Sequence, residues 1–577
     1  DAVTDADYNV AVGYNALGAN TLGNKSVAIG QGTLKSQNYT TATDAFNTVV
    51  GYHAGNDITT GVENILIGGN AGDALTDADF NVAIGHNALS SDTLGSRSVA
   101  IGYEVLKVQN FTTTTNAYNV AVGFHAGNDI TTGIQNVLIG ALVGDALTTG
   151  SYNTALGHTA LGADTLGSRS VAIGYAALDS QNLTTATEVY NTAVGFDAGG
   201  AVTTGTQNTL IGGLAGDALT AAHNNIAIGY LALGADTLGS RSVAIGTAAL
   251  DTQNFTTATN VYNVAVGYNA GTAVTTGINN TIVGGFAADA LTDADHVTAM
   301  GYGALSADTL GSRTTALGYL ALQDQNFTTA TTCNNTAVGW KAGNNLTTGQ
   351  NCTFVGAGAA SSATVTGSAN TGVGVSALSA LTSGANNTAI GDSAGVSVNS
   401  GDNNTLLGHD AGRTGSPGGN INTENNEIVL GDENISEAHI QVSLTVASDE
   451  RDKTDFVDLD LGLDFVKALE PVTYYWDKRS KYGDKYADDY DLNAQTPDGT
   501  HKEDWMDIGF KAQSVLALEE AAGYKIAEKK NLTVSLSGDG KQYGLQYEKF
   551  IPILVKAIKD QDAIITSLTA RIAALES

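Results

Sequence analysis

The feature that most constrains this chain of 577 residues is an internal repeat of 72 residues. A short motif, with Ala, an aliphatic residue and Gly in its last three positions and most often Asn in its first, ends at Gly13, Gly85, Gly157, Gly229 and Gly301. Each repeat holds three more, slightly varied copies, so neighbouring motifs lie 17, 21, 17 and 17 residues apart. A unit of 17 residues is too short to bury its own apolar side, so neighbouring units must stack.

The motif predicts a strand followed by a turn, because its apolar run is bounded by Gly and Asn. Gly supplies the positive φ that a corner needs. Asn tolerates left-handed geometry, and its amide can pair with the same amide one unit away. We therefore predict a mainly β fold, with a long repetitive parallel β-roll or β-helix-like shaft over residues 1–440. The pattern leaves open whether each coil closes within one chain or takes strands from three chains around a shared axis.

The formal net charge of −32 argues against nucleic acid or an anionic membrane as a partner, because phosphate binding needs clustered Lys and Arg. The chain has no run of about 18 apolar residues, so no membrane insertion is expected. Cys333 and Cys352 have no metal-ligand spacing, and we expect no metal and no cofactor. Residues 1–10 repeat as 73–82, so the sequence starts inside a repeat and we expect a longer polypeptide.

The longest interval of each repeat carries a Gln-Asn-x-Thr-Thr segment. Its four extra residues are expected to bulge from the shaft and present one side chain per repeat, in a row formed by Tyr39, Phe111, Leu183, Phe255 and Phe327. This row is a candidate receptor-contact surface, since aromatic faces suit sugar rings and repetition gives avidity. The alternative, which we favour because Leu183 breaks the aromatic rule, is packing against a neighbouring chain.

A second row is basic and consists of Lys25, Arg97, Arg169, Arg241 and Arg313. Each member lies five residues after a polar residue. These polar residues are Asn20, Asp92, Asp164, Asp236 and Asp308. On so acidic a surface we predict a structural ladder of ion pairs rather than a functional patch.

The last 31 residues, 547–577, are predicted to form a helix with a heptad array. The core positions of the heptad array, which we expect to associate copies of the chain, are Ile551, Leu554, Ile558, Gln561, Ile565, Leu568, Ile572 and Leu575, all apolar except Gln561. Such a repeat forms a left-handed coiled coil. Ile at one core position with Leu at the other leans towards dimers, whereas a core Gln can fix register or a trimer. The array alone does not settle the number of chains.

Four separated blocks follow one another in the C-terminal part: SDERDK from Ser448, LGLDFVKALEPVTYYW from Leu461, GFKAQ from Gly509 and YEKFIPILVKAIKDQ from Tyr547. Through these blocks, residues 448–577 resemble the endosialidase-type intramolecular chaperone family, the cleavable C-terminal domain of many phage tail spikes and fibres. The stacked units of the shaft resemble the head repeats of trimeric autotransporter adhesins and phage tail fibres. The stretch from Lys481 to Thr500 matches no motif.

The chaperone resemblance implies a small α+β domain that assembles a homotrimer and then cuts itself off. It implies Ser448 as the nucleophile, Lys453 as its base, a scissile bond between Ala447 and Ser448, and a junction over residues 441–447. A serine hydroxyl needs a nearby base, and a lysine serves if burial or a positive neighbour such as Arg451 lowers its pKa. The alternative is that Ser448 and Lys453 are linker residues.

Together these features predict a structural phage tail fibre or tailspike protein of the virion tail, involved in host attachment. Its expected partners are other copies of itself, a glycan or protein receptor on the host cell surface, and other tail proteins bound through an N-terminal region. No multi-turnover enzyme activity is expected. The alternatives are a fibre-borne polysaccharide depolymerase, which would require a non-repeated carboxylate pair, and a bacterial trimeric surface adhesin.

Overall fold

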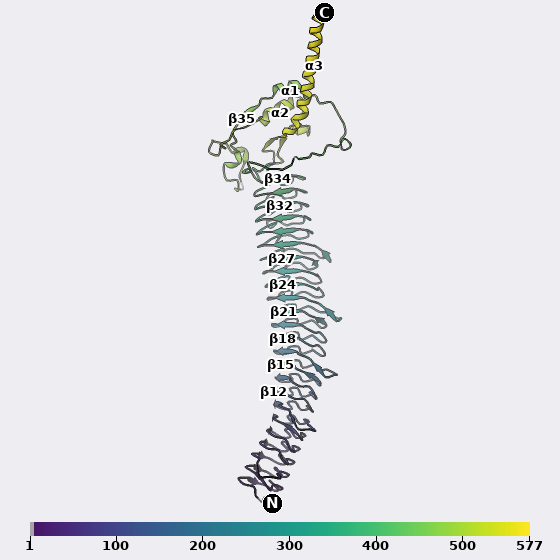
Figure 1. Cartoon of the computed structure of the whole chain (residues 1–577), viewed down its shortest axis with the longest axis vertical. Helices are drawn as coiled ribbons and strands as arrows, with labels where there is room; N and C mark the ends of the chain where they lie inside the picture. Colours follow the sequence, from purple (N-terminus) through teal and green to yellow (C-terminus); the bar gives the residue numbers. More distant parts are fainter. Residues whose placement is uncertain (1–4, 443, 488, 577) are drawn as a thin grey trace. The chain divides into compact units, whose positions relative to one another are not determined.

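The computed structural model describes residues 5–442, 444–487 and 489–576 (Figure 1). The chain divides into two compact units, residues 1–334 and 335–577, which are described separately. The outer ends predicted for the shaft and for the final helix, residues 1–4 and 577, lie outside the described residues, as do position 443 of the junction and position 488.

The first unit is a parallel β-solenoid in which one three-residue strand of each coil pairs with the strands of the coils before and after it (Figure 1). The strands of this long sheet are β1 (Val10–Val12), β3 (Val27–Ile29), β5 (Thr48–Val50), β6 (Ile65–Ile67), β7 (Val82–Ile84), β9 (Val99–Ile101), β11 (Val120–Val122), β12 (Val137–Ile139), β13 (Thr154–Leu156), β15 (Val171–Ile173), β17 (Thr192–Val194), β18 (Thr209–Ile211), β19 (Ile226–Ile228), β21 (Val243–Ile245), β23 (Val264–Val266), β24 (Thr281–Val283), β25 (Thr298–Met300) and β27 (Thr315–Leu317).

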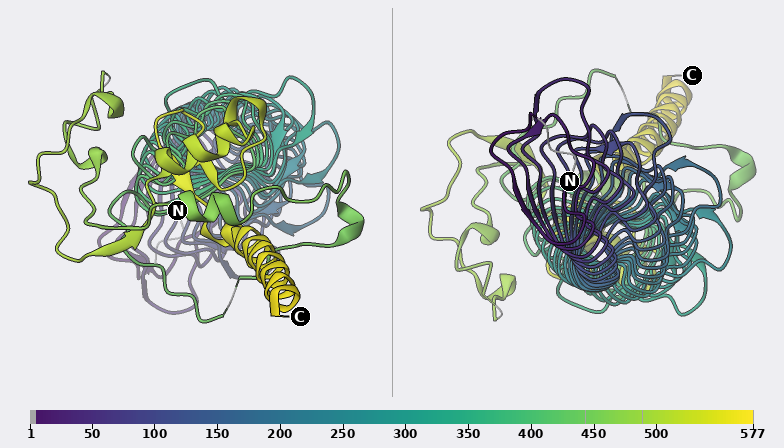
Figure 2. Two further views of the ribbon diagram at one scale, coloured as in Figure 1. Left: turned by 90° about the horizontal axis from the view of Figure 1, so that it is seen from above. Right: turned by 90° about the horizontal axis from the view of Figure 1, so that it is seen from below.

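The register of this sheet follows the spacing of the motif. Val10 lies opposite Val27, Val27 opposite Thr48, and Thr48 opposite Ile65. Each coil therefore closes within one chain, which decides the question that the sequence left open. In the right-hand view of Figure 2 the successive coils overlie one another. The predicted parallel β-roll is confirmed.

The middle residue of each long-sheet strand points into the interior of the first unit. Ala28, Leu66 and Leu138 at this position are fully buried. Beside them runs a ladder of buried asparagines: the backbone N–H of Asn64 donates to Asn47 Oδ1 at 2.9 Å, and Asn64 Nδ2 donates to the carbonyl of Ala78 at 2.8 Å. The ladder therefore satisfies backbone groups of neighbouring coils that would otherwise be buried without a partner.

Two constraints, backbone conformation and close packing, require the glycine that ends each motif. Gly157 has a φ of 141°, a value that side chains disfavour. A Cβ atom placed on it would lie 2.1 Å from the carbonyl oxygen of Gly174 in the next coil. The positive φ expected at the corners is thus confirmed, and close backbone approach adds a second reason for glycine.

The four extra residues of the longest interval are held by a second, short parallel pairing. It joins β2 to β4, β8 to β10, β14 to β16, β20 to β22 and β26 to β28. Their bounds are Gly23–Asn24 and Thr43–Asp44, Gly95–Ser96 and Thr115–Asn116, Gly167–Ser168 and Thr187–Glu188, Gly239–Ser240 and Thr259–Asn260, and Gly311–Ser312 and Thr331–Thr332. The residues just before the second strand of each pair, such as 112–114, are exposed on the surface of the solenoid.

The second unit begins with six parallel strands of the same kind. They are β29 (Thr336–Val338), β30 (Thr353–Val355), β31 (Thr371–Val373), β32 (Thr388–Ile390), β33 (Thr405–Leu407) and β34 (Ile428–Leu430). Thr353 lies opposite Thr371, a step of 18 residues. Thr405 lies opposite Ile428, a step of 23 residues, and the longer connection holds Pro417, the first proline of the chain.

The rest of the second unit is a small α+β domain. Its elements are the 3-10 turns η1 (Glu450–Asp452), η2 (Arg479–Lys481), η3 (Leu492–Ala494), η4 (Ile526–Glu528) and η5 (Tyr547–Lys549), the helices α1 (Leu463–Ala468), α2 (Ala512–Ala521) and α3 (Phe550–Glu576), and the strands β35 (Val472–Tyr474), β36 (Asp507–Gly509), β37 (Val534–Leu536) and β38 (Tyr543–Leu545). The two strand pairs, β35 with β36 and β37 with β38, are antiparallel. Leu461, Phe465, Val515, Phe550 and Ile553 pack in its core. The predicted α+β domain ending in a long helix is confirmed.

Candidate functional site

Ser448 and Lys453, the predicted nucleophile and base, lie in contact at the start of the α+β domain. Lys453 Nζ donates to Ser448 Oγ at 2.5 Å and to the Ser448 carbonyl oxygen at 3.2 Å. The short turn η1 brings the two side chains together, since it reverses the chain between them. Asp449 caps this turn by accepting from the backbone N–H of Arg451. The pair is therefore positioned by local structure alone.

The surroundings of this pair are open in a single chain. Ser448, Lys453 and Ala447 are all exposed. The guanidinium of Arg451 faces Asp449, with 2.6 Å between Arg451 Nη2 and Asp449 Oδ2, and this hydrogen bond lowers the pKa of Asp449 and raises that of Arg451. Arg451, the predicted positive neighbour, is thus paired with Asp449, and Lys453 is exposed rather than buried.

Helix α3 shows its predicted heptad positions to solvent. Ile551, Ile558, Ile565 and Ile572 are 53–65% exposed, and Leu554 and Leu568 are 45% and 48% exposed, while Gln561 and Leu575 are also exposed. The opposite face of the first turns, with Phe550, Ile553 and Ala557, is buried against its own domain. One face thus anchors the helix and the other is an apolar stripe without cover in one chain.

The row of Tyr39, Phe111, Leu183, Phe255 and Phe327 does not project from the shaft. Each of these side chains is only 6–7% exposed. The hydroxyl of Tyr39 donates to the carbonyl of Gly61, and a Cβ atom on Gly95 would lie 2.7 Å from the ring of Phe111. The expectation of a presented row is therefore wrong: the residues that follow each of these side chains, such as 112–114, are exposed, but the side chain itself turns inward and covers a glycine of the preceding coil.

Among the described residues, ion pairs form at only two members of the predicted ladder, and their partners are not the preceding acids. Lys25 pairs with Asp44 at 2.7 Å and Arg169 with Glu188 at 3.0 Å, across the short parallel strands. The earlier acids lie inside the solenoid instead: Asp164 is fully buried and accepts from Gln181 Nε2 at 2.6 Å. Burial raises the pKa of Asp164, and the hydrogen bond from Gln181 opposes this shift.

The third residue of every long-sheet strand in the first unit forms an exposed column that the sequence reasoning missed. All 18 of these residues are Val, Ile, Leu or Met, and each is partly or fully exposed. Two residues further on, many coils carry an exposed aromatic residue, namely Tyr14, Tyr52, Tyr103, Phe124, Tyr175, Phe196, Tyr230, Tyr268, Tyr302 and Tyr319. The Tyr103 and Phe124 rings stack with centroids 5.6 Å apart. The constant aliphatic residue before each motif glycine was the signal for this face.

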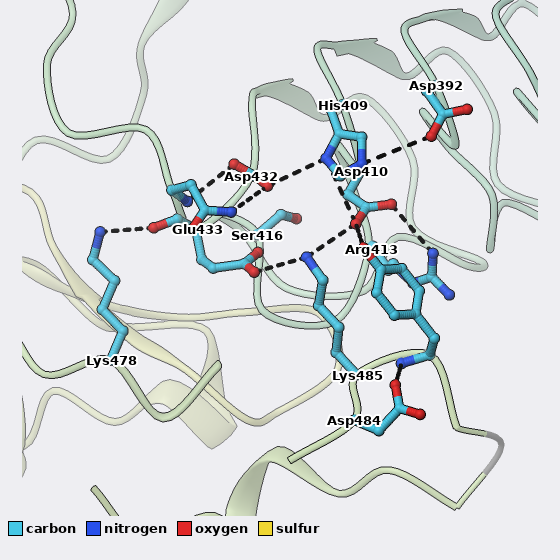
Figure 3. Close-up of polar contacts among 12 residues, drawn as sticks. Asp392, His409, Asp410, Arg413, Ser416, Asp432, Glu433, Lys478, Asp484 and Lys485 are labelled. Carbon is cyan, nitrogen blue, oxygen red and sulfur yellow. Dashed lines mark hydrogen bonds and ion pairs between the residues drawn. The ribbon is translucent and has the colours of Figure 1, made fainter. Parts of the chain in front are cut away.

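A second group missed from the sequence lies in the last coils of the second unit. His409, Asp410 and Asp432 place one ligand atom each within 4.8 Å of one another, a set that could hold a metal ion (Figure 3). Asp410 already faces two cations, with Lys485 Nζ at 3.0 Å and Arg413 Nη1 at 3.2 Å. Lys485 and Arg413 thus balance the charge of the Asp410 carboxylate. His409, Asp410 and Asp432 therefore belong to a network of ion pairs.

The protein consists of a parallel β-solenoid followed by a small α+β domain, with a Ser–Lys pair where that domain begins. Its class is therefore a repetitive shaft with a C-terminal accessory domain. The family model Peptidase_S74, described as "Chaperone of endosialidase", matches residues 448–524. The chain therefore carries an endosialidase-type chaperone domain after its solenoid, and the match begins at Ser448. Neither a curated protein nor a solved structure matches the chain. Among the described residues, no helix has the length and apolar character needed to cross a membrane.

Proposed function

We propose that this chain is the shaft and self-assembling end of a phage tail fibre or tailspike, a structural protein of the virion tail that contacts the host surface. The observation that carries the proposal is an endosialidase-type chaperone domain placed after a long β-solenoid, since such domains are typical of phage tail fibres and spikes. Residues 1–440 serve as the shaft, 441–447 as the junction, and 448–577 as the chaperone domain.

The assembled form is a homotrimer. Two apolar surfaces that are uncovered in one chain support self-association: the heptad stripe of α3 and the aliphatic column of the shaft. Monomeric soluble proteins rarely expose continuous apolar patches of this extent. A second copy of the chain matches the column coil for coil, because it has the same strand spacing of about 4.8 Å.

After assembly, the chaperone domain cuts the chain before Ser448. Ser448 Oγ bonds to the Ala447 carbonyl carbon while Lys453 takes the hydroxyl proton. The C–N bond between Ala447 and Ser448 then breaks, and a proton passes to the departing amine. Water hydrolyses the resulting ester to a carboxylic acid and restores the hydroxyl. The Ser448–Lys453 hydrogen bond supports these roles, and packing of three chains would supply the burial that favours a neutral lysine.

The purpose of scission is kinetic locking. Once the unit that sets register is no longer joined to the shaft, an unfolded shaft has lost its nucleus and refolding cannot compete with unfolding. The Ser448→Ala variant should remain full-length and dissociate on heating in SDS, whereas the parent should show a break before Ser448 by mass spectrometry and stay trimeric. The exposed neighbour Thr445 offers the control, Thr445→Ala, which should cut as the parent does. An intact parent chain, or equal SDS resistance of cut and uncut trimers, would contradict the proposal.

A further inference from the structure

The segment that follows β35, residues 478–486, lies against the last coils of the solenoid within the second unit (Figure 3). Lys485 Nζ lies 2.8 Å from Glu433 Oε1 and 3.0 Å from Asp410 Oδ2. The three side chains are 13%, 5% and 1% exposed. One cation from the α+β domain thus neutralises two acids of the solenoid end in a site with little access to water.

Further contacts surround this ion triad. The hydroxyl of Tyr486 donates to Asp410 Oδ2 at 3.1 Å, and the guanidinium of Arg413 lies 4.5 Å from the centroid of the Tyr486 ring. Lys478 Nζ donates to the carbonyl oxygen of Glu433 at 2.8 Å. Every group on one side belongs to residues 410–433, and every group on the other side belongs to residues 478–486.

Two close contacts of the backbone show that the α+β domain fits the end of the solenoid specifically. A Cβ atom on Gly415 would lie 2.7 Å from Cβ of Ser480. Away from the triad, the turn between β37 and β38 reaches the same long connection of the solenoid, where the backbone N–H of Asn420 donates to Asp539 Oδ2 at 3.1 Å. The α+β domain therefore contacts the solenoid end at two places that do not depend on the chain between Glu433 and Ser448.

Asp410 stays charged at this contact although it is buried. Burial by itself raises the pKa of Asp410, but the hydrogen bond and charge of Lys485 outweigh it and hold this pKa below its ordinary value. Burial lowers the pKa of Lys485, and its bonds to Glu433 and Asp410 raise it above its ordinary value. Removing the lysine would leave two buried like charges side by side, which is far more costly than losing an exposed ion pair.

We propose that residues 478–486 form a clamp that keeps the chaperone domain on the end of the shaft after the backbone has been cut, so that scission breaks the backbone without releasing the domain. This inference rests on the proposed function for its meaning, but the contacts that carry it are independent of Ser448 and Lys453. The described residues of the linker that scission would cut, 434–442 and 444–447, are exposed.

The test uses the full chain with Ser448→Ala and a site-specific protease sequence inserted after Ala447, so that cutting does not depend on the serine. After protease treatment, the domain should co-elute with the shaft on size exclusion at low protein concentration. Adding Lys485→Ala should speed release of the domain by about thirtyfold or more. Lys467→Ala is the matched control, since its ammonium lies 3.5 Å from Asp464 on its own helix α1, and it should leave release unchanged.

A third variant separates loss of the clamp from misfolding. Combining Lys485→Ala with Asp410→Asn and Glu433→Gln removes the unpaired charges, and should restore much of the retention lost in Lys485→Ala. Immediate separation of the cut parent, or equal release rates for the Lys485→Ala and Lys467→Ala chains, would overturn the clamp. Failure of the unmodified protein to cut itself would instead count against the proposed scission alone.

Discussion

The solenoid and the α+β domain differ in how often each contact occurs. In the first unit the same strand pairing, asparagine ladder and glycine contact return in coil after coil. In the α+β domain the core of Leu461, Phe465 and Val515 and the antiparallel pairing of β35 with β36 each occur once. A repeated contact can be made equally well in the wrong coil, whereas a single contact identifies its partner. For this reason a shaft of near-identical coils benefits from an end whose contacts each occur once.

The largest effect is expected where a repeated contact is broken inside the solenoid. Gly157→Ala would force a Cβ atom to within 2.1 Å of the Gly174 carbonyl oxygen at a φ of 141°, and should cost about 2–4 kcal/mol of local stability. Hydrogen exchange should show faster opening of the coils around residues 154–174. The control is Gly213→Ala, whose Cβ would meet nothing closer than a Tyr230 ring atom at 3.6 Å. Equal exchange in the two variants would contradict the close-approach argument.

A second test concerns the non-repeated end. Ile558 is 65% exposed in one chain, so Ile558→Glu should leave the folded domain intact and abolish assembly, because a charge would enter the core of the helical bundle. Sedimentation should report a fall from trimer to monomer with unchanged far-ultraviolet circular dichroism. Thr566→Glu, an exposed change on the same helix outside the heptad positions, should stay trimeric. A trimeric Ile558→Glu chain would show that α3 is not the assembly helix.

The smallest effect is expected from the buried acids Asp92, Asp164, Asp236 and Asp308. Burial holds the pKa of each above its ordinary value of 3.8. The folded chain therefore takes up protons before the unfolded chain does as the pH falls from neutral. The free energy of unfolding should rise until the pH reaches the ordinary value, and then level off.

Replacing all four acids by Asn should reduce this gain between pH 7 and pH 5, measured as the shift in thermal unfolding midpoint. The chain itself offers a precedent, since Asn20 stands at the equivalent place and accepts from the Gly23 N–H at 2.9 Å. Asp129→Asn, a change at an exposed acid, is the control and should keep the full gain. An unchanged pH dependence in the fourfold variant would show that these carboxyls are not the source.

The sequence predicted the structure correctly where a motif repeats. It did not predict contacts that occur once, or the direction in which the side chain of an inserted segment points. The spacing of the motif predicted strands, register and glycine corners. It did not predict that Phe111 turns inward, because the need to cover Gly95 is visible only once β8 and β10 are paired. The contact of Lys485 with Asp410 joins residues 75 positions apart without any repeat, so no pattern could indicate it. Ser448 and Lys453 lie five residues apart in a segment with a family resemblance, and their side chains are in contact, while their catalytic roles stay a prediction.

Because each coil closes within one chain, the length of the shaft can change through deletion or duplication of repeats in the gene. A deletion of 72 residues, such as 73–144, removes four coils, and the strands on either side of the gap carry the same motif at the same spacing. Recombination between near-identical stretches of the gene can therefore shorten or extend the solenoid in whole steps. The C-terminal domain is left unaltered by such changes, so the length of the solenoid and the C-terminal domain can evolve separately.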